Sequence, residues 1–348
     1  MKHTRISYKL CALVLLLAMC LGLTGCGESK ESQVQIAAMD TIMTLTAYGD
    51  KRDAGLAAAK SVIQSMDGIL DPELETSITY AINHAEGKNV SITGQMAKML
   101  SCAQEVYKRS DGAFDPSLYP LIKLWGFVDS RYYVPTMTEI SEALGKRAFG
   151  QMALTSFPSS GSYAVCFPAG TEISFASIAK GCAAENAVSA MRQAGVTSGI
   201  ISLGGNVQTL GQKPDGSDWT IAIQDPNNTS SYLGVLNVGE TAVVTSGGYQ
   251  RFFTSNGKTY QHILNPKTGM PVTNSLLSVT IVCQDGTMAD CLSTAMYILG
   301  VNNALNYWRA HDGFEMVMVT NDNQVICTSG LIEEFTLSNK SYTLSFTE

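Results

Sequence analysis

Asp290 and Thr294 are the residues of this 348-residue chain whose types and spacing point most directly to chemistry. They lie four positions apart in an apolar run, 288–299, whose pattern predicts a helix. Side chains four apart share one helix face, and a carboxylate beside a hydroxyl offers hard oxygen ligands that suit Mg²⁺. The alternative is structural: an Asp that stabilises the dipole near a helix N-terminus, with Thr294 bonding back to a carbonyl.

Two basic side chains are further candidates. Lys180 lies among small residues in the first turn of a predicted helix, 178–194, where free N–H groups and a cation suit a phosphate. His262 precedes a polar turn, 265–269, and its ordinary pKa suits a general base. A solvated surface lysine and a hydrogen-bonded structural histidine are the alternatives, and they remain open at this point.

Loops rich in Gly, Asp or Asn follow or precede several predicted strands and could bring backbone close to a ligand: 111–116, 204–206, 246–248 and 265–269. Each is weak alone, because ordinary turns use the same residues. The sequence has no G-x-S-x-G, Walker A or G-x-G-x-x-G motif and no histidine cluster of the metal-binding type. These absences disfavour acyl-hydrolase and P-loop chemistry.

The elements that must position these residues can be read from hydrophobic periodicity. It predicts strands over 34–48, 199–203, 219–224, 233–237, 242–245, 259–264, 277–283, 314–320 and 325–328. It predicts helices over 53–70, 93–108 with Thr93 as N-cap, 178–194, and 289–299 ended by Gly300. Because strands outnumber helices and do not alternate strictly with them, the fold class is α+β.

The first residues predict export rather than fold. Lys2, Arg5 and Lys9 precede an apolar run, 11–23, and the run ends in Leu-Thr-Gly-Cys at Cys26. This order resembles a bacterial lipoprotein signal. We therefore expect a cleaved signal peptide over 1–25, a lipidated Cys26 with a tether over 26–34, and one domain over 35–348. The protein would be lipid-anchored at the extracytoplasmic face of the cell membrane.

Composition narrows the function classes. The chain carries 23 Lys and Arg against 30 Asp and Glu, and this acidic balance argues against general binding to nucleic acid. Six of its nine cysteines lie beyond Cys26, with no C-x-x-C spacing, so no zinc or redox motif is visible. Buried free thiols are the simpler interpretation of these six.

The motifs taken together resemble one family. In order, the chain carries Met-Asp-Thr at 39–41, Asp-Gly-Ala-Phe-Asp-Pro at 111–116 with Leu-Trp-Gly-Phe at 124–127, Ala-Lys-Gly at 179–181, Leu-Gly-Gly-Asn at 203–206, Thr-Ser-Gly at 245–247, His-Ile-Leu-Asn-Pro-Lys-Thr-Gly at 262–269, and Ala-Asp at 289–290 with Thr294. This set, from about residue 37 to 301, is similar to the ApbE family, the FAD:protein FMN transferases.

The resemblance implies a fold, a reaction and roles for residues. The fold would be a single α+β domain related to the T-fold class. The enzyme would use FAD and Mg²⁺, transfer FMN to a Thr or Ser hydroxyl of an exported target protein, and release AMP. The implied Mg²⁺ ligands are Asp290, Thr294 and the carbonyl of Ser177, and the implied base is His262. The implied flavin-nucleotide contacts are Met39, Ala113, Phe114, Asp115, Lys180 and Ile263.

The chain departs from the family pattern in places. Glu73 falls near the position of a Tyr that stacks on the flavin, Ser174 replaces an acidic residue, and Gly248 stands where a polar residue is common. The acceptor motif of the family, Asp-Gly-x-Ser/Thr-Gly-Ala-Thr/Ser, is absent, so self-flavinylation is not expected. An Mg²⁺-dependent FAD pyrophosphatase and a non-catalytic flavin-binding lipoprotein are the alternative functions.

Overall fold

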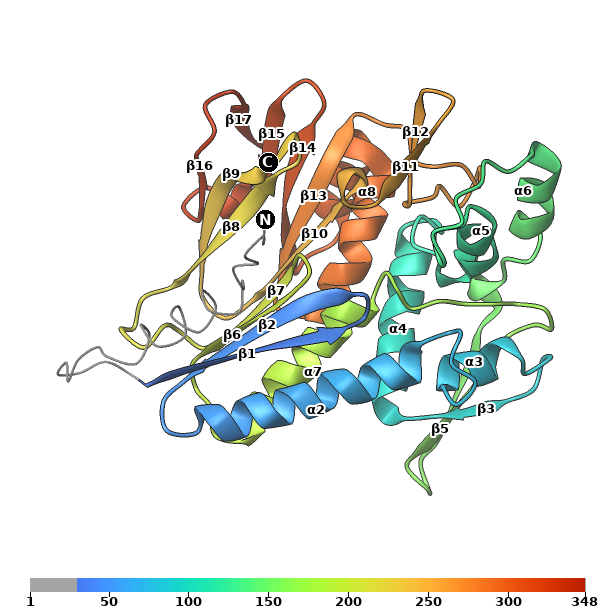
Figure 1. The fold of residues 1–348 in the computed structure, drawn as a ribbon, viewed down its shortest axis with the longest axis horizontal. Helices are drawn as coiled ribbons and strands as arrows, with labels where there is room; N and C mark the ends of the chain where they lie inside the picture. Colours follow the sequence, from blue (N-terminus) through green and yellow to red (C-terminus); the bar gives the residue numbers. More distant parts are fainter. Residues whose placement is uncertain (1–29, 348) are drawn as a thin grey trace, which may run out of the picture. The chain divides into compact units, whose positions relative to one another are not determined.

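A nine-stranded sheet forms the centre of the computed structural model, which describes residues 30–347 (Figure 1). The predicted signal peptide and Cys26 lie outside the described residues. Neighbouring strands are antiparallel except β15 and β17, which are parallel. In spatial order the strands are β1 (Glu31–Ala38), β2 (Thr41–Tyr48), β6 (Gly199–Leu203), β7 (Asn206–Leu210), β10 (Ala242–Gly247), β13 (Leu276–Cys283), β14 (Phe314–Thr320), β15 (Gln324–Thr328) and β17 (Thr343–Thr347).

Each face of this sheet is covered by a different layer. In β14, Met316 and Met318 pack into the cluster that contains the helices, whereas Val317 and Val319 pack into a second cluster. This alternation follows from the two-residue period of a strand. The helical layer comprises α2 (Arg52–Leu70), α4 (Gly94–Arg109), α7 (Ala179–Gln193) and α8 (Gly286–Ala310). The opposite layer is a smaller sheet of β8 (Trp219–Asp225), β9 (Asn228–Val238) and β16 (Phe335–Leu337).

Several smaller elements lie beside one end of the helical layer. A third hydrophobic cluster joins Trp125, Phe127, Phe253 and Leu264 with α5 and α6. These elements are α3 (Ile78–Asn83), α5 (Tyr119–Leu124), α6 (Met137–Leu144), the sheet of β3 (Val90–Ile92), β4 (Ala153–Phe157) and β5 (Ser162–Cys166), and the hairpin of β11 (Phe252–Ser255) and β12 (Lys258–Gln261). Single turns of 3₁₀-helix lie at Pro116–Leu118, Phe149–Gln151, Gly248–Gln250 and Ser329–Leu331.

The α+β prediction is confirmed, and so is Thr93, whose Oγ1 accepts a hydrogen bond from the N–H of Met96. The single strand predicted over 34–48 is wrong. Met39 and Asp40 adopt φ values of 49° and 58°, so the chain turns there and forms the β1–β2 hairpin. The strand β1 also begins at Glu31, so the last residues expected in the tether are paired with β2.

Two further boundaries differ from the prediction. The helix expected over 289–299 begins at Gly286, because Asp285 caps it by accepting a bond from the N–H of Met288. Gly300 breaks the helical geometry with φ 74° and ψ 170°, but a second segment continues to Ala310. The strand expected over 259–264 ends at Gln261, and only Leu264 forms an isolated bridge, with Pro271.

Within the described chain, the six cysteines beyond Cys26 are free, as expected; four are buried, and Cys102 and Cys166 are half-buried. None of the helices formed by residues 30–347 has both the length and the apolar character required to cross a bilayer.

Candidate active site

The crossing of α7 and α8 fixes one wall of a cavity. A Cβ atom on Gly181 would lie 2.1 Å from the carbonyl oxygen of Gly286 and 2.6 Å from the Cβ of Asp290. Only glycine therefore permits this approach of the two helices. The first turn of α7, with Lys180, is thereby brought beside Asp290 of α8.

Asp290 is 4% exposed and bonded to the neighbouring helix. Its Oδ2 accepts a hydrogen bond from the N–H of Gly181 at 2.8 Å. Burial raises the pKa of Asp290, while the charge of Lys180 and the Gly181 bond act to lower it. The residue thus stabilises the N-terminus of α7, whereas Asp285 is the cap of its own helix. The sequence left open that Asp290 stabilises a helix N-terminus. It does so, but the helix is α7 and not α8, to which Asp290 belongs.

Hydroxyl groups continue the wall beyond Asp290. Ser246 Oγ lies 2.8 Å from Ser293 Oγ and 3.4 Å from Thr294 Oγ1. Ser293 donates to the backbone oxygen of Asp290 at 2.9 Å. The hydroxyl of Thr294 therefore faces a serine of β10 across the cavity wall, on the same side of α8 as Asp290.

The residues of this corner fit Mg²⁺. The carboxylate of Asp290, the hydroxyl of Thr294 and Ser177 all line one cavity. Asn206 adjoins this corner: it lowers the pKa of Asp290, and its buried Nδ2 has no hydrogen-bond partner. Residues 30–347 contain no group of three or more His, Cys, Asp or Glu side chains that could hold a metal. One carboxylate with neutral oxygens is the donor set through which Mg²⁺ joins protein to substrate phosphates.

Lys180 lies in the first turn of α7, where the helix has no side-chain cap of its own. It is half-buried and lines the cavity, so it is not a solvated surface lysine. Its positive charge acts on the pKa of both Asp290 and His262. A cation at the positive end of the helix dipole favours an anion at this end of α7.

His262 stands on the opposite wall, just beyond β12. Its Nδ1 and its backbone N–H both lie 3.0 Å from the carbonyl oxygen of Arg251. A carbonyl can only accept, so Nδ1 carries the proton and Nε2 keeps its lone pair. Burial lowers the pKa of His262 to about 4, and the charges of Arg251 and Lys180 act in the same direction. His262 is therefore a neutral acceptor at neutral pH.

The 110–116 loop supplies a third part of the lining. The Oγ of Ser110 accepts a hydrogen bond from the N–H of Phe114, whose ring is buried. Asp115 also lines the cavity, but its oxygens bond Ser117 at 2.6 and 2.9 Å and Arg147 at 3.2 Å. Burial raises the pKa of Asp115 despite these partners. Its carboxylate is occupied within the protein and shapes the loop.

The structure brings nearly all the predicted site residues together. The following line one cavity: Ala113, Phe114, Asp115, Ser177, Lys180, His262, Ile263, Asp290 and Thr294. Met39 is not among the lining residues; it sits in the β1–β2 turn, where its N–H bonds Asp67 Oδ1 at 2.9 Å.

Two of the three departures from the family pattern, Ser174 and Glu73, lie in different surroundings. Ser174 is buried and lines the cavity. Glu73 is exposed, does not line the cavity, and accepts a hydrogen bond from the hydroxyl of Tyr119. Glu73 therefore makes an internal polar contact in this chain.

Sequence reasoning missed Arg251 and Gln250, which also line the cavity. Arg251 holds His262 through its carbonyl and donates from its guanidinium to the carbonyl of Phe127. Both residues follow the 246–248 loop after Tyr249, so that loop was the available signal. Periodicity could not place them, because the 3₁₀ turn Gly248–Gln250 and the β11–β12 hairpin lie outside the central sheet.

Comparison with known proteins gives one consistent result. The family model described as "ApbE family" matches residues 39–318. An FAD:protein FMN transferase of Klebsiella pneumoniae is 30% identical over 270 residues, which cover 77% of this chain and 83% of the relative. One of Treponema pallidum is 28% identical over 363 residues, covering 99% of both chains. The crystal structure of the ApbE protein from Thermotoga maritima superposes with a TM-score of 0.79 at 26% identity, over 87% of this chain and 98% of that chain.

Proposed function

The chain belongs to the ApbE family, and from this premise we propose that it uses Mg²⁺ to transfer FMN from FAD to a Thr or Ser hydroxyl of an exported protein. At the level of enzyme class it is an FAD:protein FMN transferase, like its relatives. The observation that carries the finer proposal is the meeting of Asp290, Thr294, Lys180 and His262 around one cavity.

The reaction exchanges a phosphoanhydride bond of FAD for a phosphoester bond to the acceptor. The acceptor hydroxyl oxygen bonds to the phosphorus of the FMN half, and the bond from that phosphorus to the oxygen of AMP breaks. AMP leaves with the bonding electron pair, and the hydroxyl proton is taken up by a base. Atoms and charge balance without an oxidant or a reductant.

The polar corner of the cavity binds and orients the pyrophosphate. Lys180 supplies a positive charge at the start of α7, where the helix dipole also favours an anion. The carboxylate of Asp290, the hydroxyl of Thr294 and the carbonyl of Ser177 would hold Mg²⁺. When bound, the ion supplies electrostatic stabilisation of the developing negative charge. Phe114, Ile122 and Phe127 line the apolar part, which suits a flat ring system.

His262 accepts the proton of the acceptor hydroxyl at Nε2. The bond from Nδ1 to the Arg251 carbonyl holds the ring in the required tautomer. Its pKa of about 4 keeps the nitrogen unprotonated before reaction. A bound pyrophosphate would raise that pKa, because nearby negative charge favours the protonated ring.

We place the enzyme outside the cytoplasm as a lipoprotein anchored through Cys26. Support comes from the positive residues, apolar run and Leu-x-Gly-Cys ending of residues 1–26. An exported enzyme would meet acceptor proteins that are exported too. Metabolic labelling with palmitate tests the anchor, and Cys26→Ser should remove the label.

An adduct assay tests the function. The chain from Gly27 onward is incubated with FAD, an acceptor domain bearing the family motif, and either Mg²⁺ or EDTA, and mass spectrometry follows the acceptor and AMP. We expect an FMN adduct and equimolar AMP only with Mg²⁺. Asp290→Asn keeps an acceptor for the Gly181 N–H but loses the charge, and should lower the rate about 100-fold. AMP and FMN without adduct would indicate the pyrophosphatase instead, and neither product would indicate a flavin-binding protein.

A further inference from the structure

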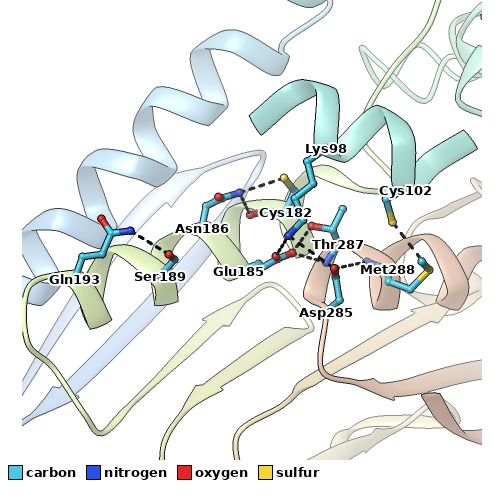
Figure 2. A network of polar contacts seen from close by, with 10 residues as sticks. All are labelled: Lys98, Cys102, Cys182, Glu185, Asn186, Ser189, Gln193, Asp285, Thr287 and Met288. Carbon is cyan, nitrogen blue, oxygen red and sulfur yellow. Dashed lines mark hydrogen bonds and ion pairs between the residues drawn. The ribbon is translucent and has the colours of Figure 1, made fainter. Parts of the chain in front are cut away.

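A second polar contact joins α7 to α8 on the side away from the cavity. Glu185 of α7 accepts hydrogen bonds from Thr287 at the start of α8, at 2.5 Å from Oγ1 and 3.3 Å from the backbone N–H (Figure 2). Thr287 is 3% exposed, so this contact is shielded from water. Glu185 does not line the cavity, and the reaction as described does not use it.

This contact mirrors the one made by Asp290. The N–H of Gly181, in the first turn of α7, donates to a carboxylate of α8, and the N–H of Thr287, in the first turn of α8, donates to a carboxylate of α7. Each helix thus satisfies an unpaired N–H at the N-terminus of the other. One carboxylate of the pair, Asp290, faces the cavity, and the other, Glu185, faces Lys98 of α4.

Where these two bonds lie, the backbones of the helices approach each other at Gly181 and Gly286, without side chains between them. A contact between glycines has no side-chain ridge that fits a groove, so it offers little local resistance to sliding or rotation. The two polar links therefore help to fix the register and rotation of the start of α8 on the start of α7, in addition to the packing of both helices in the core.

Glu185 is not needed to begin α8. Asp285 already caps that helix through the N–H of Met288 at 2.9 Å. The ion pair of Glu185 with Lys98, at 2.5 Å, adds little, because the side chain of Lys98 is 64% exposed. Glu185 also faces the carboxyl group of Asp285 and interacts with it electrostatically. Its hydrogen bonds to Thr287 are the contact that joins α7 to the first turn of α8, and this contact acts on the orientation of the helix.

We propose that Glu185 is a positioning residue that sets the orientation of Asp290 and Thr294 toward the cation through its bonds to Thr287. The inference rests on the proposed function, since it assumes that these two side chains hold Mg²⁺. Loss of the link lets α8 shift on the glycine contact, so the oxygen donors no longer converge. Supporting contacts behind metal ligands change affinity by about 10- to 100-fold, and an indirect link belongs at the lower end.

Direct metal binding tests this without the reaction. Mn²⁺ alone is titrated into the chain from Gly27 onward, without FAD, and free Mn²⁺ is measured by electron paramagnetic resonance. We expect Glu185→Met, which removes the acceptor at a similar side-chain size, and Thr287→Val each to weaken Mn²⁺ binding about tenfold. Thr287→Val keeps the branched shape and removes only the hydroxyl donor. The double variant should be no weaker than either single variant, because both break one link.

Glu240→Met is the matched control. Glu240 also pairs with a cation of α7, Arg192, and accepts a backbone N–H, that of Gly211 at 2.7 Å, but at the other end of the helix. The Mn²⁺ affinity of this control should equal that of the unmodified chain, even if its melting temperature falls as far as that of Glu185→Met. Equal weakening in the control, or a change below twofold in Glu185→Met, would overturn the positioning role.

Kinetics give a second, independent readout. The Mg²⁺ concentration for half-maximal transfer should rise about tenfold in Glu185→Met, while the KM for FAD and the rate at saturating Mg²⁺ stay within twofold. A fall in the rate at saturating Mg²⁺ with no change in the Mg²⁺ requirement would contradict the inference. If the unmodified chain makes the adduct but binds no Mn²⁺ through Asp290, the inference fails while the transferase proposal stands.

Discussion

The two walls of the cavity are built in opposite ways. The wall with Lys180 and Asp290 consists of two helices that approach closely because Gly181 and Gly286 have no side chains. The wall with His262 consists of irregular chain around the β11–β12 hairpin, held by large side chains. There Tyr132 stacks on Phe253 at 4.9 Å, and Trp125 donates to the carbonyl of Gly269 at 3.0 Å.

The contrast separates two kinds of sensitivity. On the helical wall, the backbone positions themselves carry the geometry, so adding a single methyl group changes it. On the wall with His262, a ring is held by one carbonyl and by packing, so its removal leaves the backbone in place. A substitution in the helical wall should therefore lower both the stability of the protein and its activity. A substitution of His262 in the other wall should lower activity alone.

The largest effect should come from His262→Ala. Removing a general base typically costs 10²- to 10⁴-fold, so we expect transfer to fall about 1,000-fold. FAD affinity by fluorescence quenching and the melting temperature should stay near those of the unmodified protein. If His262→Ala lost FAD binding as well as transfer, the structure of this wall would depend on the His262 side chain, and the contrast with the helical wall would fail.

Gly181→Ala should have the next largest effect. Its Cβ would overlap the carbonyl oxygen of Gly286, and overpacking of this kind lowers the free energy of unfolding by about 3 kcal/mol. Mn²⁺ binding should be lost as well. Gly68→Ala, within α2, is the matched control: no atom lies within 4 Å of its added Cβ, so stability should rise by about 0.5–1 kcal/mol. Urea unfolding of both variants measures the difference, and equal stability of the two would refute the close-contact argument.

The smallest effect should be a dependence of stability on pH from His262. Its folded pKa is lowered to about 4, mainly by burial, from an unfolded value of 6.5. The unfolded chain therefore takes up a proton first, so this contribution is fully present above pH 6.5 and is lost as the pH falls toward 4. Between pH 7.5 and 5.0 the unmodified protein should lose about 2 kcal/mol more than His262→Gln. Parallel curves for the two proteins would mean that the ring is freely solvated.

Local pattern was enough for much of the fold. Thr93 marks the start of α4 through its own hydroxyl, and the strands β13 and β14 follow nearly continuous runs of apolar residues. The break at Met39 and Asp40 was missed, because two non-glycine residues with positive φ inside a Thr-rich strand pattern leave no glycine signal. The extension of α8 past Gly300 was missed because a glycine usually marks the end of a helix. Here Gly300 lies at a kink, and a second helical segment follows it.

The site was predictable through its motifs rather than through its geometry. Spacing alone left Asp290 between a metal ligand and a dipole partner, because the residue it bonds, Gly181, lies 109 positions away. The role suggested for Glu185 was invisible for the same reason, since its partner Thr287 lies 102 positions away. Long-range pairs of this kind follow from the packing of helices that no local pattern describes.

The distance along the chain between Gly181 and Asp290 also orders the assembly of the protein. An unfinished chain that ends before α8 has a bare N-terminus on α7 and lacks the carboxylate that completes it. Closing a loop of this length costs entropy that only the docked helices repay, so the contact forms after the local helices and hairpins. The cation site that we propose would consequently form late in folding, and binding of a metal ion would report that both helices have docked.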